Sequence, residues 1–156
     1  MAHVLETGFE ILQRDNPNGS PTVMGYNIIN GELRSSSDGE TFESRNPAWT
    51  DDCLGVFPLS TKKDVHDALE SARAAFAEWS RTPAPSRGQI IGNMGRLLME
   101  YKDDIVRVET REIGKTLKES AGEVQEAIDT CLFFQSEGRR LYGQTVNSEL
   151  PDKELF

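Results

Sequence analysis

Cysteine, histidine and long apolar runs are scarce in this sequence. Its 156 residues include two cysteines and two histidines; Cys53 and Cys131 are too few for a disulfide framework and are not spaced as metal ligands. A membrane-spanning helix needs about 20 consecutive apolar residues, and no apolar stretch in this sequence approaches that length. The N-terminus lacks the basic flank and apolar core of a signal peptide. We therefore expect a cytoplasmic protein with no membrane partner.

Basic residues are also in deficit. Lys and Arg number 17 against 26 Asp and Glu, which gives a net charge of −9 at pH 7. A chain of this charge repels the phosphates of nucleic acids, so we expect no nucleic-acid partner. The length and the hydrophobic content of 37% suffice for one domain with a core, or for part of a larger domain.

The first part of the chain is rich in turn signals. Residues 1–21 mix polar residues with Pro and Gly, a composition that predicts a mobile arm. After this arm, Asn30-Gly31 separates Tyr26–Ile29 from Glu32–Arg34. Asn-Gly accepts the positive φ angles of a type I′ turn, so the two flanking segments are predicted to form a β-hairpin.

Two further strands are predicted before the helices begin. Thr41–Arg45 reads as a short strand, and Asn46-Pro47 follows it as a turn. Leu54–Pro58 reads as another strand, in which Pro58 either ends the strand or places it at a sheet edge.

Three amphipathic helices should follow. Thr61 and Asp64 approximate a capping box for the first helix, whose apolar stripe is Val65, Leu69, Ala72, Phe76 and Trp79. Ser86 would cap the second helix, in which Gly92 and Gly95 are weak points and the stripe is Ile90, Ile91, Met94, Leu97, Leu98 and Tyr101. The third would open at Asp103 and close at Gly114.

A longer helix is predicted over Leu117–Tyr142, with Gly143 as a left-handed cap. Steps of three and four place one apolar stripe on it, consisting of Leu117, Ala121, Val124, Ile128, Cys131 and Phe134. Such a helix is not stable alone, so the stripe must be covered by other parts of the protein.

The motifs that could carry chemistry all have simpler interpretations. Gly114-Lys115-Thr116 resembles the end of a phosphate-binding loop, but Glu109 occupies the position of the first required glycine, so we predict a helix C-cap. A dinucleotide-binding G-x-G-x-x-G sequence does not occur. Cys131 lies on the apolar stripe, which predicts a buried structural thiol. Cys53 follows two aspartates, an unfavourable setting for a thiolate nucleophile.

The remaining candidates are interpreted as surface or core residues. His66 falls on the polar side of the first helix and should be exposed. The acidic run Glu119, Glu123, Glu126 and Asp129 is typical of a solvated face rather than a metal site. Phe76 and Trp79 are predicted to be core anchors. We therefore assign no catalytic, cofactor-binding or metal-binding residue in this chain.

The order of these segments resembles the N-terminal region of the aldehyde dehydrogenase superfamily, from about residue 24 to the end. The resemblance is carried by four segments: Ile29-Asn30-Gly31-Glu32, Thr41 to Ala48, Asp64 to Trp79 with Arg87 after it, and Glu109 to Lys115. Three others are similar to semialdehyde dehydrogenases, of the 2,5-dioxovalerate and aminoadipic semialdehyde types: Pro83 to Gly88, Gly122 to Asp129 and Glu137 to Gly143.

The resemblance implies an α/β fold with short β-hairpin strands followed by about four amphipathic helices. Residues 22–143 would be the N-terminal part of the dinucleotide-binding domain, and residues 144–156 would start the oligomerisation arm. Some family members hold a monovalent cation near the positions of Ser44, Arg45 and Glu112, but Glu112 replaces the more usual aspartate.

The resemblance also implies what the chain does. It would be a fragment of an NAD(P)-dependent dehydrogenase that oxidises an aldehyde, with the nucleophilic cysteine, the general-base glutamate and the cofactor-binding glycines further along. The fragment alone should be inactive, should not bind NAD or NADP tightly and should expose apolar stripes. Its partner would be the remainder of the dehydrogenase or a second copy in a homo-oligomer. The alternative is a non-catalytic interaction module or split-gene subunit that docks with a chain carrying the catalytic half.

Overall fold

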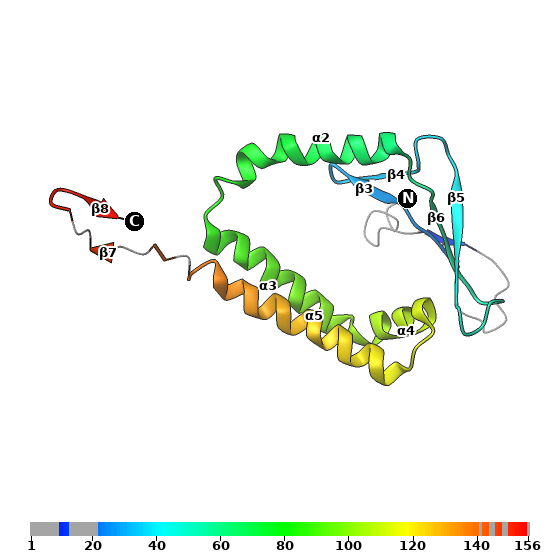
Figure 1. Cartoon of the computed structure of the whole chain (residues 1–156). Helices are drawn as coiled ribbons and strands as arrows, with labels where there is room; N and C mark the ends of the chain where they lie inside the picture. Colours follow the sequence, from blue (N-terminus) through cyan, green and yellow to red (C-terminus); the bar gives the residue numbers. More distant parts are fainter. Residues whose placement is uncertain (1–9, 13–21, 141, 144–145, 148–149, 156) are drawn as a thin grey trace. The chain divides into compact units, whose positions relative to one another are not determined.

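The computed structural model describes residues 10–12, 22–140, 142–143, 146–147 and 150–155. In this part of the chain short strands precede four helices, as predicted (Figure 1). The elements are β1 (Glu10–Leu12), β2 (Thr22–Met24), β3 (Asn27–Ile29), β4 (Glu32–Arg34), β5 (Thr41–Arg45), β6 (Cys53–Pro58), α2 (Lys62–Trp79), α3 (Ala84–Glu100), α4 (Lys102–Ile113), α5 (Leu117–Glu137), β7 (Val146–Asn147) and β8 (Glu154–Leu155). The chain forms two compact units: residues 1–81 with 101–124, and residues 82–100 with 125–156.

The first unit contains a four-stranded mixed sheet in the order β1-β2-β6-β5. Strand β6 is central because β5 pairs with it antiparallel and β2 pairs with it in parallel. Its first four residues are buried, as expected for a strand that is flanked on both sides. Pro58 ends β6 as predicted, but the alternative placement at a sheet edge is wrong.

Strands β1 and β2 were not predicted. The three residues of each are too short for a periodic signal, and the parallel pairing of β2 with β6 joins segments about 30 positions apart. Strand β1 falls within residues 1–21, and the rest of that predicted arm lies outside the described residues.

The predicted hairpin is confirmed. Strands β3 and β4 pair around Asn30 and Gly31, whose φ angles are 55° and 73°. These positive values are those that a type I′ turn requires.

The start of α2 is also confirmed. The Thr61 side chain accepts hydrogen bonds from the backbone of Lys63 and Asp64, and the Asp64 side chain bonds back to the Thr61 backbone. This reciprocal capping box satisfies backbone N–H groups that the first helical turn leaves unpaired.

Gly114 ends α4 in the left-handed conformation, with φ at 75°, and its N–H donates to the carbonyl of Thr110. A Cβ at this position would also lie 2.8 Å from Pro47. Just beyond the turn, Ser120 of α5 is fully buried and accepts a hydrogen bond from the Thr110 hydroxyl at 2.8 Å. The predicted C-cap is therefore confirmed, and the turn brings α5 back against α4.

In the second unit, α3 lies beside the C-terminal part of α5 (Figure 1). The contact is made by a glycine seam, which consists of Gly88, Gly92 and Gly95. A Cβ at Gly88 would lie 2.5 Å from the backbone oxygen of Gln135, and one at Gly95 would lie 2.8 Å from Cβ of Cys131. Gly92 and Gly95, predicted as weak points, lie inside a continuous helix, and together with Gly88 they let the two helices approach closely.

The start of α3 and the end of α5 differ from the prediction. Helix α3 begins at Ala84, so Ser86 lies inside its first turn and is not the cap; Pro85 is accommodated because the first turn needs no intrahelical N–H donor. Helix α5 ends at Glu137 rather than Tyr142, so Gly143 is not its cap. The chain instead passes Ala84 at Gly138, where a side chain would collide with the Ala84 carbonyl.

Much of the predicted core is exposed. The stripe of α5 is buried at Val124, Ile128 and Cys131 but not at its ends, since Leu117 and Phe134 are more than half exposed. Phe76 is 66% exposed and Trp79 43%, so the assignment of these two residues as core anchors is wrong for this chain. The only residue of α2 buried in the described structure is Asp64. The predicted exposed apolar stripes are therefore confirmed.

The last described element is a small hairpin of β7 and β8, with Asp152 at a φ of 62° between them. Whether residues 144–156 start an oligomerisation arm stays a prediction. Among the described helices, none combines the length and the apolarity needed to span a bilayer.

Candidate functional site

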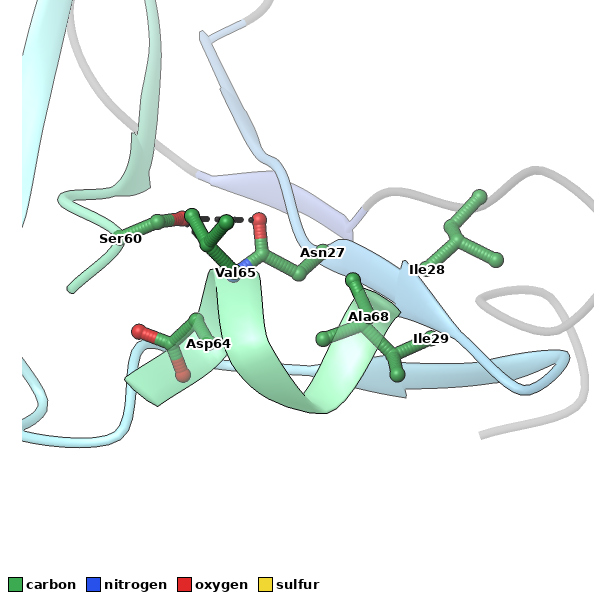
Figure 2. Close-up of a pocket in the computed structure, with 7 residues that line it drawn as sticks. All are labelled: Asn27, Ile28, Ile29, Ser60, Asp64, Val65 and Ala68. Carbon is green, nitrogen blue, oxygen red and sulfur yellow. Dashed lines mark hydrogen bonds between the residues drawn. The ribbon is translucent and has the colours of Figure 1, made fainter. Parts of the chain in front are cut away.

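A hollow with both polar and apolar walls lies between the β3–β4 hairpin and the start of α2 in the first unit (Figure 2). Its volume is about 190 Å³, and it is lined by Asn27, Ile28, Ile29, Ser60, Asp64, Val65 and Ala68. The Asn27 amide and the Ser60 hydroxyl are joined by hydrogen bonds of 2.9 and 3.1 Å. We call it the β3–α2 hollow.

Asp64 is the buried ionisable group of this hollow. One of its oxygens, Oδ2, accepts hydrogen bonds from the backbone N–H and hydroxyl of Thr61 at 2.7 and 3.0 Å, and from the same groups of Ser37 at 3.2 and 3.3 Å. The backbone hydrogen bond from Thr61 is the main reason that the pKa of Asp64 lies below its ordinary value, against the opposing effect of burial.

These contacts give Asp64 a structural role. A general base must be free to accept a proton from a substrate, whereas this carboxylate is held as an anion by four donor contacts. The other polar groups of the hollow, Asn27 and Ser60, bond to each other. The volume is below the roughly 300–1,000 Å³ of typical ligand pockets, so the hollow is too small for a dinucleotide cofactor.

A second polar cluster fixes α4 to the turn between β5 and β6. Arg111 donates from Nε and Nη2 to the two oxygens of Asp52, at 3.0 and 2.7 Å. Asp52 is fully buried and also accepts from the Asn46 side chain at 3.2 Å. A carboxylate can be buried only when it is paired in this way. Because its hydrogen bonds are already made within the chain, the cluster holds α4 against the sheet and is not a reactive site.

A third cluster surrounds the turn from α4 to α5. Lys115 donates to Glu109 at 2.7 Å and also to Glu123. The hydrogen bond to Glu109 is the largest cause of a raised pKa of Lys115, and the hydrogen bond from Lys115 is the largest cause of a lowered pKa of Glu123. Thr116 and Glu119 bond reciprocally at the start of α5, which lowers the pKa of Glu119.

The other residues considered in the sequence lie as follows. Cys53 and Cys131 are both buried thiols, and they belong to different units. Cys131 packs at the glycine seam, which confirms its structural role. His66 is exposed as predicted. The acidic run of α5 is exposed, also as predicted, although Glu119 and Glu123 make the specific bonds described above.

Two of the three positions matched to a monovalent cation site have side chains whose setting can be described. The Arg45 guanidinium donates to the Thr50 carbonyl at 2.9 Å and pairs with Glu43, while Glu112 is exposed. In the described part of the chain, no three His, Cys, Asp or Glu residues are grouped so that they could hold a metal ion.

Sequence reasoning missed the Asp52–Arg111 pair and the role of Lys115. Asp52 and Arg111 are 59 positions apart, so no local pattern links them. Lys115 had a local signal, because Glu109 lies six positions before it, on the other side of Gly114, and Glu123 lies eight positions after it.

The chain as a whole belongs to the aldehyde dehydrogenase family, whose sequence pattern matches residues 33–156. It is 38% identical over 130 residues to the alpha-ketoglutarate semialdehyde dehydrogenase of Haloferax volcanii, and 36% identical over 129 residues to the NADP(+) succinate-semialdehyde dehydrogenase of Escherichia coli. Each match covers 83% of this chain and 27% of the relative. The chain therefore spans about a quarter of the length of the curated relatives it matches.

Solved structures agree with this assignment. The fold is similar to that of betaine aldehyde dehydrogenase from Staphylococcus aureus in complex with NAD+, with a TM-score of 0.77, 27% identity and coverage of 83% of this chain and 26% of that one. An NAD-dependent aldehyde dehydrogenase from Sinorhizobium meliloti has the same fold, with a TM-score of 0.82 at 22% identity over 92% of this chain and 29% of that one. The strands and helices described above are the N-terminal part of the aldehyde dehydrogenase fold.

Proposed function

We propose that this chain is the N-terminal portion of an NAD(P)-dependent aldehyde dehydrogenase that oxidises an aldehyde, of the semialdehyde class, to a carboxylic acid. The observation that carries the proposal is the extent of the family match, which spans most of this chain but only about a quarter of its relatives. The identities to semialdehyde dehydrogenases support the substrate class.

The chemistry would be supplied by the remainder of the dehydrogenase. A cysteine thiolate there would attack the aldehyde, the bound cofactor would accept the hydride, and water would release the acid. Neither Cys53 nor Cys131 is suited to this role, because both thiols are buried within the packing of this chain. The β3–α2 hollow is smaller than a dinucleotide cofactor requires.

The chain itself would act as a structural support. Its polar clusters are saturated by internal hydrogen bonds, while its helices present uncovered apolar side chains, among them Val65 and Phe76 of α2. Exposed apolar surface of this extent is typical of a part that packs against a further part of the same protein.

A direct test is an activity assay on the purified 156-residue protein with a semialdehyde and either NAD+ or NADP+. We expect no aldehyde-dependent formation of reduced cofactor. Robust formation would contradict the assignment of the catalytic groups to the remainder.

A non-catalytic module or split-gene subunit is the second candidate, and the same uncovered helix faces favour it. Detection of the native protein in its source cells, with an antibody to residues 61–142, separates the two. A band several times heavier than 17.4 kDa supports a portion of one long dehydrogenase chain. A band at 17.4 kDa supports a separate subunit, and the protein that is captured with it should then carry the catalytic cysteine and glutamate.

A further inference from the structure

Helix α3 has two different sides. One side is the glycine seam against α5. The other, which we call the α3 outer face, consists of residues spaced by three and four positions: Arg87, Ile90, Ile91, Met94, Leu97 and Leu98. Ile90, Met94 and Leu97 are 51%, 48% and 56% exposed, although each has the character of a core residue.

An arginine lies within this apolar face. Arg87 is half-buried, and its Nε is a buried nitrogen that has no hydrogen-bond partner among the described residues. A buried donor without a partner is rare in native proteins and costs free energy. If a second surface covered the α3 outer face without pairing Arg87, the guanidinium would lose its remaining water as well.

The charge of α3 points to the nature of that surface. This helix carries two arginines and one glutamate, in a chain whose net charge is −9. Arg96, on the side opposite Arg87, already bonds to Asn93. Arg87 is therefore the cation that the α3 outer face offers to a covering surface.

A second copy of this chain is poorly suited to bury the α3 outer face. A two-fold contact through the α3 outer face would bring the same patch of both copies together, so each Arg87 would meet another apolar face that contains an arginine. The large negative charge of each copy would add repulsion. An unlike surface that carries a carboxylate meets the requirements better.

We propose that the α3 outer face docks onto the remainder of the dehydrogenase, and that an Asp or Glu of that remainder pairs with Arg87. The inference rests on the proposed function, because it takes the covering surface from the three quarters of the family's length that this chain does not span. The apolar contact would be made by Ile90, Met94 and Leu97. The ion pair of Arg87 would fix the position of α3 relative to the surface that covers it.

Zero-length cross-linking of the native protein in its source cells tests the carboxylate directly. In an Arg87→Lys variant, a carbodiimide can join the new amine to a carboxylate that touches it, with loss of water. Mass spectrometry should find position 87 joined to an Asp or Glu outside residues 1–156. The matched variant Arg96→Lys, on the other side of the same helix, should give no such product.

The unfolding of the native protein gives a second measurement. Removal of one partner from a desolvated charge pair should raise the unfolding constant about thirtyfold in Arg87→Gln. The change should be below about threefold in Arg96→Gln, whose guanidinium is on the surface.

The outcomes separate the inference from the proposed function. The docking inference would be overturned by any of three results: cross-links of position 87 only to residues 1–156, no cross-link at all, or equal effects of the two glutamine variants. None of these results would contradict the proposal that the chain is a portion of an aldehyde dehydrogenase. A native protein of 17.4 kDa with no second polypeptide would overturn both.

Discussion

Asp52 and Arg111 are joined by two hydrogen bonds of 2.7 and 3.0 Å although they lie 59 positions apart in the sequence. Asp52 is fully buried in the connection between β5 and β6, and Arg111 lies in the last turn of α4. Both oxygens of the buried carboxylate are therefore paired, and the pair ties a helix to the sheet of the first unit.

Replacement of Arg111 by Met should destabilise the protein by about 3–5 kcal/mol, because it leaves the Asp52 carboxylate buried without its cation. Urea unfolding measures the loss. The control is Arg107→Met, which removes an exposed pair with Asp104 on the same helix and should cost less than about 1 kcal/mol. Equal losses in the two variants would show that the buried pair does not hold α4 in place.

Ala at Gly88 should cost about 1–3 kcal/mol, because the added Cβ would lie 2.5 Å from the backbone oxygen of Gln135 and the two helices would have to separate. Gly122→Ala is the matched control on α5, where nothing lies within 4 Å of the added Cβ. That change should stabilise by about 0.5–1 kcal/mol, since Ala is the better helix former. Thermal unfolding of both variants measures the difference, and opposite signs are expected.

Acid should weaken the start of α2. The pKa of Asp64 is lowered from 3.8 in the folded protein by hydrogen bonds from Thr61 and Ser37, so the folded state binds its proton less readily than the unfolded state. The stabilisation is complete above 3.8 and is lost as the pH falls through the lower folded pKa.

Asp64→Asn should make stability less dependent on pH in this range, as measured by urea unfolding at several pH values. The variant should also be less stable than the parent near neutral pH. An unchanged acid slope would show that Asp64 does not contribute to it.

The uncovered stripes should bind a hydrophobic dye. Phe76 of α2 is 66% exposed, and contiguous exposed apolar surface enhances the fluorescence of dyes such as anilinonaphthalene sulfonate. We expect strong fluorescence from the 156-residue protein, a decrease in Phe76→Ser and no decrease in Glu70→Ser on the same helix. Fluorescence no greater than that of an ordinary folded protein would count against exposed stripes.

Local signals predicted the local structure well. Asn30-Gly31 predicted the hairpin because few other dipeptides accept positive φ at both positions. Thr61 with Asp64 predicted the start of α2, and Gly114 predicted the end of α4, because capping depends on residues within one turn. The clusters at Asp64 and Lys115 are built mostly on these same turns.

Apolar periodicity predicted helices but not their buried sides. Helix α3 has an apolar stripe through Ile90 and Met94, yet the side against α5 is the one with Gly88 and Gly92. Periodicity shows that an apolar stripe must be buried, but it does not show whether the surface that buries it belongs to the same chain. The contradicted placement of Phe76 and Trp79 has the same cause.

The sequence by itself determined the Asn30-Gly31 turn, the caps at Thr61 and Gly114, the succession of short strands and four helices, and the resemblance that the family match confirmed. These features depend on residues that are neighbours along the chain. Tertiary structure alone decided the parallel pairing of β2 with β6, the pairing of Asp52 with Arg111 and the glycine seam. Each joins distant segments by close approach of backbones or by burial of charge, and such contacts leave no periodic trace in the sequence.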